Sequence, residues 1–121
     1  MPSLNVAKYI DECMNSVLSQ TLEDIEVLCI DAGSTDGTIE KLQAYVDSDS
    51  RVKLLHSSQK SYGYQVNLGI SKANGKYIAI VETDDFIKTN MYELLYLAAE
   101  DADANVVKAN FYSFVNYDGD N

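Results

Sequence analysis

One stretch of the sequence decides the expected fold: Lys76-Tyr77-Ile78-Ala79-Ile80-Val81-Glu82-Thr83-Asp84-Asp85-Phe86. Residues 77 to 81 are nearly all apolar and partly β-branched, which is typical of a strand buried on both faces of a parallel sheet. Three acids follow at the carboxyl end of this strand. Open α/β sheets bind ligands outside the carboxyl ends of their strands, so Glu82, Asp84 and Asp85 lie where chemistry is expected.

The acids have two interpretations. Carboxylate oxygens at this density suit Mg²⁺ or Mn²⁺, which prefer hard oxygen ligands. The alternative is a solvated turn whose aspartates cap the following helix. The predicted buried strand in front of the acids favours a ligand site.

Composition limits the other possibilities. The chain has 121 residues, of which 46% are hydrophobic, and this fits one modest domain or part of one. Nine basic against nineteen acidic residues give a net charge of -10. Such a surface is not built to neutralise nucleic-acid phosphates or to lie on anionic lipid. An anionic ligand would therefore need a metal to mediate its binding.

Cysteine usage and hydropathy indicate a cytoplasmic protein. The two cysteines, Cys13 and Cys29, fall within apolar patterns and lack metal-ligand spacing. We interpret them as core residues of a reducing compartment, not as a disulfide. No apolar run is long enough to span a bilayer, and the first residues do not resemble a signal peptide.

Periodicity predicts strands that alternate with helices. The expected helices are 5–20, 38–46, 64–73 and 90–101, and the expected strands are 25–30, 51–55, 77–81 and 105–115, the last of which is either one strand or a strand pair. Residues 1–4 are too short to predict a strand. The first helix should bury Val6, Ile10, Cys13, Met14, Val17 and Leu18, and the last should bury Met91, Leu94, Leu95, Ala98 and Ala99. The alternation predicts a three-layer α/β/α fold with a mostly parallel sheet and no internal domain boundary.

Two loops carry further candidate residues. Asp31 ends a predicted strand and is placed to accept hydrogen bonds from a nucleobase or ribose; the alternative is that it only orders its own loop. Asp36, in the same loop, is expected to cap the next helix. Lys60, in the polar loop 57–65, could offset the charge of a diphosphate, with Tyr62 or Tyr64 forming a wall; the alternative is an exposed lysine on a mobile loop.

Other catalytic motifs are absent. The sequence contains no Gly-x-Ser-x-Gly, no Walker-type Gly-Lys-Ser/Thr and no Gly-x-Gly-x-x-Gly. His56, the sole histidine, has no apparent partner for metal binding or acid-base work, and a surface role at a strand end is expected. The acids remain as the centre of chemistry.

Five short motifs follow one another in a specific order: Pro2-Ser3-Leu4-Asn5, Ser19-Gln20-Thr21, Asp31-Ala32-Gly33-Ser34-Thr35-Asp36-Gly37, Asn67-Leu68-Gly69-Ile70 and Val81-Glu82-Thr83-Asp84-Asp85. In this order they resemble the family 2 glycosyltransferases of GT-A fold, the Rossmann-like fold of nucleotide-diphospho-sugar transferases. The resemblance covers essentially the whole chain. It implies a nucleotide-diphosphate-sugar donor, Mg²⁺ or Mn²⁺, and transfer of a hexose-type sugar to a glycan acceptor in bacterial cell-surface polysaccharide synthesis.

The resemblance also implies roles for particular residues. Glu82, Asp84 and Asp85 correspond to the family's DxD region as metal ligands, with Asp84 also contacting the nucleotide sugar. Asp31 matches the first residue of the family's acidic pair after its second strand. Lys60 falls near a basic contact to the nucleotide.

Departures from the family pattern lead to further expectations. Ala32 stands where many members have a second Asp that contacts the base, so base recognition is expected to be weak. Glu82 replaces the more frequent Asp and lengthens the arm. Residues 1–121 resemble the amino-terminal, nucleotide-sugar-binding half of such an enzyme, with the first strand and the acceptor half expected to be missing and the catalytic base expected beyond Asn121. The chain alone is expected to be inactive in transfer, and unpaired strand edges favour a homodimer.

Two alternatives to an enzyme remain at this point. A non-catalytic nucleotide- or metal-binding α/β module would use the same acids. A receiver-like signalling domain also clusters acids at strand ends, but its phosphoacceptor strand pattern is absent. The chain itself is expected to be soluble, and the resemblance leaves open that the full-length enzyme lies at the cytoplasmic face of the membrane.

Overall fold

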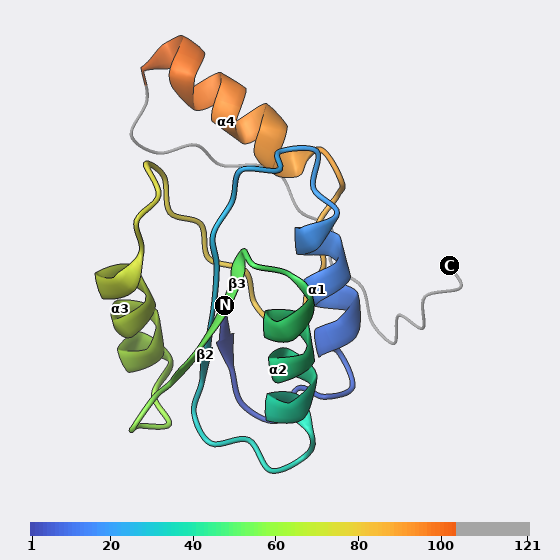
Figure 1. Ribbon diagram of the computed structural model, residues 1–121. Helices are drawn as coiled ribbons and strands as arrows, with labels where there is room; N and C mark the ends of the chain where they lie inside the picture. The colour runs from blue at the N-terminus through green and yellow to red at the C-terminus, as the bar shows by residue number, and fades with distance from the viewer. Residues whose placement is uncertain (104–121) are drawn as a thin grey trace.

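The computed structural model describes residues 1–103 and shows a parallel sheet covered by helices on both faces (Figure 1). The strands are β1 (Pro2–Ser3), β2 (Val27–Asp31) and β3 (Val52–His56), in the order β1-β2-β3. Ser3 lies opposite Asp31, and Asp31 lies opposite His56. The predicted parallel α/β architecture is confirmed.

Four helices surround this sheet in the described part of the chain: α1 (Ile10–Leu18), α2 (Thr38–Ser48), α3 (Tyr62–Lys72) and α4 (Met91–Ala102). In Figure 1, α1 and α2 lie side by side on one face, and α3 lies on the other. Each predicted helix is present, with ends shifted by a few residues. None of these helices is long and apolar enough to cross a membrane.

The core lies between β2, α1 and α2. Of the residues expected on the inward face of α1, Ile10, Cys13, Met14 and Val17 are buried, and Val6 and Leu18 pack partly buried at its edge. They meet Val27, Cys29, Leu42 and Val52. Cys13 and Cys29 are both free and buried, which confirms that they are core residues.

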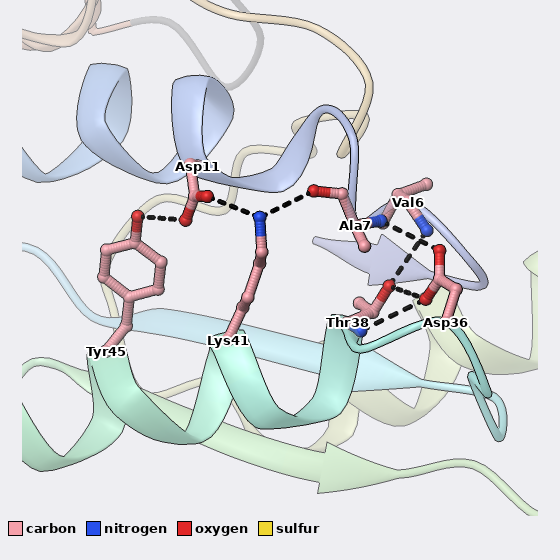
Figure 2. Close-up of polar contacts among 7 residues, drawn as sticks. All are labelled: Val6, Ala7, Asp11, Asp36, Thr38, Lys41 and Tyr45. Carbon is pink, nitrogen blue, oxygen red and sulfur yellow. Dashed lines mark hydrogen bonds and ion pairs between the residues drawn. The ribbon is translucent and has the colours of Figure 1, made fainter.

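A polar network on the surface joins α1 to α2 (Figure 2). Lys41 Nζ lies 2.7 Å from Asp11 Oδ2 and donates to the carbonyl oxygen of Ala7 at 3.0 Å. The Tyr45 hydroxyl donates to the other oxygen of Asp11 at 2.7 Å. Exposed ion pairs add little stability, so this network joins the two helices without contributing much to the folding free energy.

The prediction that residues 1–4 form no strand is wrong. Ile30 N donates to Met1 O at 3.0 Å, and Ala32 N donates to Ser3 O at 3.1 Å. Proline cannot donate to a ladder and is tolerated on an edge strand, and Pro2 lies on the outermost strand of the described sheet. Pairing with the long-range partner β2 stabilises a strand that has too little local signal to predict.

Residues 77–81, predicted to be a strand buried on both faces, form no strand in the structure. Ile78 is 53% exposed and Ile80 is 50% exposed, whereas Val81 is buried. A strand here would pair beside β1, but β1 offers two residues, and the contact formed is the hydrogen bond from Thr83 Oγ1 to Pro2 O. Among residues 1–103 this stretch has no longer strand beside it, so its backbone does not join the sheet ladder. The strand prediction is therefore wrong, and the acids are anchored by contacts of their turn with β1 and α1.

The prediction of which α4 residues are buried is also wrong in part. Ala99 is buried, but Leu94 is 57% exposed and Ala98 is exposed as well. An open groove of about 960 Å³ is lined by β2 and the segment before it, residues 73–81, α3 and α4. Because residues 77–81 do not form a sheet strand, they offer α4 no sheet face against which to pack. The predicted strand at 105–115 lies outside the described residues.

The start of α4 is tied to the end of α1 through a buried glutamine. Gln20 Nε2 donates to Lys88 O at 2.6 Å, and Gln20 Oε1 accepts from Tyr92 N at 3.0 Å. Thr21 N donates to Thr89 O at 2.9 Å. These bonds give the Ser19-Gln20-Thr21 motif a structural role, because they fix the chain that leaves the acids.

Candidate ligand site at the carboxyl edge of the sheet

The candidate site lies at the edge of the sheet where the parallel strands end. Asp31 is the last residue of β2, and His56 is the last residue of β3. The turn with the acids meets the same edge, because the Thr83 hydroxyl donates to Pro2 O at 2.9 Å and is 5% exposed. Segments that are far apart in the sequence thus bring their polar residues to the edge where α/β sheets bind ligands.

Asp31 is fully buried and its carboxylate is saturated by its own loop. It accepts four hydrogen bonds, from Ser3 Oγ, Gly33 N, Ser34 N and Ser34 Oγ, at 2.6 to 2.9 Å. A carboxylate offers about four lone-pair sites. The geometry supports the alternative in which Asp31 orders the loop, and a direct contact with a nucleotide stays a prediction.

The protonation state of Asp31 follows from these contacts. Burial raises the pKa of Asp31, but the hydrogen bonds from Ser34, Ser3 and Gly33 together outweigh it and hold the pKa below its ordinary value. Asp31 is therefore an anion at neutral pH that already has its partners.

Asp36 stabilises the amino-terminal end of α2 (Figure 2). Its Oδ1 accepts from the amide and the hydroxyl of Thr38, at 3.1 and 2.6 Å, and its Oδ2 accepts from Ala7 N at 3.1 Å. The Thr38 hydroxyl in turn accepts from Val6 N at 3.0 Å. The expected structural role of Asp36 is confirmed, and its bonds join the loop after β1 to the loop after β2.

The backbone of the acidic turn is fixed by two neighbouring elements. Glu82 O accepts from Cys13 Sγ of α1 at 3.5 Å and from Asp85 N at 3.0 Å. The Thr83 hydroxyl fixes the turn to β1. The backbone of the turn is therefore tied to both β1 and α1, and its carboxylates project from these attachment points.

The side chains of the turn crowd negative charge together. Asp84 and Asp85 are exposed, and Glu82 is half-buried. Burial raises the pKa of Asp85, and the nearby charges of Asp84 and Glu82 raise it further. Repulsion of this kind is relieved by a cation.

The donor set fits a divalent cation that is shared with a ligand, and does not form a complete cage. Within residues 1–103, no group of three or more His, Cys, Asp or Glu side chains is arranged to hold a metal ion by itself. Mg²⁺ is commonly bound by one or two carboxylates, with phosphates and water completing its shell. Two carboxylates of this turn would satisfy that pattern, and the assignment of Glu82, Asp84 and Asp85 all as ligands stays a prediction.

The loop after β3 faces solvent. Lys60 is exposed and has no hydrogen-bond or ion-pair partner in the described part of the chain. His56 is exposed at the end of β3, in agreement with its expected surface position. Tyr64 accepts a hydrogen bond from Ser58 Oγ at 3.3 Å, and the Tyr62 hydroxyl donates to Glu82 Oε1 at 2.5 Å. Tyr62 thus joins this loop to the acids, although the sequence indicated it only as a wall for a ligand.

Gln65 was not predicted as part of the site, yet it fastens α3 to the strand ends. It is 5% exposed, and its Nε2 donates to Ser3 O at 3.0 Å and to Ile30 O at 2.8 Å. One turn further, an added Cβ at Gly69 would lie 2.8 Å from Ile30 Cδ1, so α3 packs very closely on β2. The available signal was Gln65 and Gly69 at i and i+4, which places a polar residue on the inward face.

Comparison with known proteins identifies the family of this chain. Residues 1–120 match the model of the glycosyl transferase family 2. Glycosyltransferase GlyG of Streptococcus pneumoniae serotype 4 (strain ATCC BAA-334 / TIGR4) is 42% identical over 120 residues, which are 98% of this chain and 40% of GlyG. The uncharacterized glycosyltransferase EpsJ of Bacillus subtilis (strain 168) is 34% identical over 112 residues, which are 93% of this chain and 33% of EpsJ. The chain spans well under half the length of these curated relatives.

Solved structures show the same fold. S. aureus TarS 1-349 in complex with UDP superposes with a TM-score of 0.76 and is 25% identical, covering 83% of this chain and 30% of that one. The TarS 1-349 complex with UDP-GlcNAc has a TM-score of 0.74, with the same identity and coverage. The described residues therefore form part of a GT-A fold, as predicted from the sequence.

Proposed function

The chain belongs to glycosyl transferase family 2, and on that premise we propose that the carboxyl edge of its sheet binds a nucleotide-diphosphate sugar with a divalent cation, for transfer of the sugar to a glycan acceptor. One observation carries the proposal: the turn of Glu82, Asp84 and Asp85 is anchored to β1 and α1, and its carboxylates crowd together beside the strand ends. An acidic site facing an anionic ligand has little else than a cation to offset the repulsion.

The proposed roles follow from the exposure of each group. Glu82, Asp84 and Asp85 would hold the cation, the two aspartates from exposed positions and Glu82 from a half-buried one. Lys60, exposed on the loop after β3, would offset part of the diphosphate charge. When bound, the cation supplies charge neutralisation of the departing diphosphate. Asp31 would act indirectly, because its hydrogen bonds hold the loop 31–37 in place.

The relatives support a nucleotide-sugar donor. TarS, which shares the fold, has been solved with UDP and with UDP-GlcNAc. For this chain we propose a nucleotide-diphosphate sugar of the same class and a glycan acceptor in polysaccharide synthesis. Because residues 1–121 span a minority of GlyG and EpsJ, the complete transfer reaction is a proposal for the whole protein.

Calorimetric titration with UDP tests the donor site. In Mn²⁺ the wild type is expected to bind UDP, and binding should be lost in excess chelator. Asp84→Asn and Asp85→Asn should each weaken metal-dependent binding at least tenfold, or about 1.4 kcal/mol. Asp101→Asn, which removes an equally exposed carboxylate from α4, is the matched control and should bind like the wild type.

Two results would overturn the proposal. The first is equal UDP affinity with Mn²⁺ and with chelator, which would exclude a cation from the site. The second is a large loss of melting temperature in metal-free Asp84→Asn or Asp85→Asn, which would mark these carboxylates as structural. Within residues 1–103, neither side chain makes a hydrogen bond or ion pair that would lead us to expect such a loss.

A further inference from the structure

Tyr62 and Glu82 are twenty residues apart in sequence and come from different elements, yet their side chains meet at the proposed cation site. Tyr62 is the first residue of α3, and its hydroxyl donates to Oε1 of Glu82. Tyr62 is 52% exposed, so the contact does not result from dense packing around the ring. We propose that Tyr62 is a positioning residue that holds the Glu82 carboxylate in the orientation needed to bind a divalent cation, an inference that rests on the function proposed above.

The freedom that Tyr62 removes is the freedom of the Glu82 side chain. The backbone of Glu82 is already held by Cys13 and Asp85, and the adjacent Thr83 is bonded to Pro2. The long glutamate side chain would otherwise sample many rotamers, and ordering them on binding costs affinity. A hydrogen bond to one carboxylate oxygen lowers this cost before the cation binds.

Tyr62 can impose an orientation because its own helix is fixed at the same edge. The first turn of α3 is capped by Ser61, whose hydroxyl oxygen accepts from Tyr64 N at 3.3 Å. Three residues after Tyr62, the buried Gln65 bonds to Ser3 O and Ile30 O at the ends of β1 and β2. Glu82 is therefore connected to the sheet in two ways, through its own turn and through Tyr62 on α3.

The contact leaves Glu82 able to act as a ligand. A carboxylate has about four lone-pair sites, and the phenol uses one of them without neutralising the charge. Hydrogen bonds of this kind to ligating groups fix the ligand, and their removal usually weakens metal binding. In residues 1–103, neither Asp84 nor Asp85 has a side-chain hydrogen bond. The hydrogen bond from Tyr62 therefore restrains Glu82, which has the longest of the three acidic side chains. A glutamate at this position reaches further than an aspartate, and Tyr62 compensates for the flexibility that comes with the length.

The test measures the affinity for Mn²⁺ alone, by electron paramagnetic resonance of the free ion, so it does not depend on catalysis. Tyr62→Phe removes the hydroxyl and keeps the ring, and it should weaken Mn²⁺ binding about tenfold. Tyr64→Phe is the matched control, because Tyr64 is also exposed on the first turn of α3 and its hydroxyl bonds to Ser58 and not to an acid. It should bind Mn²⁺ like the wild type.

A double-mutant cycle separates positioning from general stability. If Tyr62 acts through Glu82, adding Tyr62→Phe to Glu82→Gln should cause no further loss of Mn²⁺ affinity. An additional tenfold loss in that background would overturn the proposal, as would wild-type affinity in Tyr62→Phe alone. Tighter binding by Tyr62→Phe would show that the hydroxyl competes with the cation, and would also overturn it. If Mn²⁺ alone does not bind to the wild type, the same variants are compared in the presence of UDP. Failure of the wild type to bind Mn²⁺ both alone and with UDP would defeat the cation site of the proposed function and this inference with it, whereas the other outcomes defeat this inference alone.

Discussion

The hydroxyl of Ser3 donates a 2.7 Å hydrogen bond to Oδ1 of Asp31, and the same two residues lie opposite each other in the register of β1 and β2. Both are buried. This bond joins the last residue of one strand to the last residue of the next, at the edge where the acidic turn is anchored. It explains how a strand of two residues can define one side of the candidate site.

Ser3→Ala is expected to lower the free energy of unfolding by roughly 1.5–3 kcal/mol, because a buried hydrogen bond to a charged acceptor is lost. Urea denaturation followed by circular dichroism at pH 7 measures the change. Ser71→Ala is the matched control, since its hydroxyl bonds to Leu68 O on an exposed helix surface, and a change below about 0.5 kcal/mol is expected there. Equal losses in the two variants would contradict a special role for the Ser3–Asp31 bond.

The stability difference between the wild type and Asp31→Asn is expected to depend on pH. The pKa of Asp31 in the folded protein lies below the unfolded value of about 3.9. The carboxylate therefore contributes its full stability above the unfolded pKa, and this contribution is lost as the pH falls through the folded pKa. Unfolding measured at pH 7 and again below pH 3 should show a large gap that shrinks in acid. A gap that stays constant over this range would mean that the charge of Asp31 is not what stabilises the loop.

Gly37, the residue before α2, has φ 101°, a backbone conformation that L-residues rarely adopt. Gly37→Ala is expected to cost about 1–2 kcal/mol of folding free energy from this strain alone, because no atom lies near an added Cβ. Gly63→Ala is the control: it is also unobstructed, but it lies within α3, where alanine should be neutral or stabilising by up to about 1 kcal/mol. Thermal melting of both variants checks the opposite signs.

The two thiols are expected to be unreactive in the native protein. Burial raises the pKa of Cys13 to about 12 and that of Cys29 to about 11, so almost no thiolate is present at pH 8. An aromatic disulfide reagent at pH 8 should label neither thiol in the folded chain and both in urea. Fast labelling of a thiol without denaturant would contradict the buried positions of these residues.

Base discrimination is expected to be weak. Ala32 is buried, has no polar side-chain atom, and its backbone amide is already bonded to Ser3 O at 3.1 Å. Neither its side chain nor its amide is thus free to bond a base, and a missing polar partner reduces specificity. In Mn²⁺, the affinities for UDP and GDP should agree within about tenfold, a gap of 1.4 kcal/mol. A larger preference for either nucleotide would show that another residue reads the base.

Local sequence pattern was sufficient for much of the fold. The apolar stripe from Ile10 to Val17 identified the buried face of α1, and the cap at Asp36 identified the start of α2. It was insufficient for residues 77–81, where an apolar, β-branched run predicted a strand that does not form. A run of apolar and β-branched residues favours a strand, but a strand forms only where another strand supplies the partner of each backbone hydrogen bond.

The sequence by itself determined the alternation of strands and helices, the burial of Cys13 and Cys29, and the presence of acids after residue 81, because each of these depends on spacing along the chain. Only the tertiary structure decided that Asp31 is saturated by its loop and that Tyr62 holds Glu82. Both results depend on pairs of groups that folding brings together from different elements. The type of a side chain shows which hydrogen bonds it can make. Whether its lone pairs are already occupied depends on neighbours from other elements, whose positions the sequence alone does not reveal.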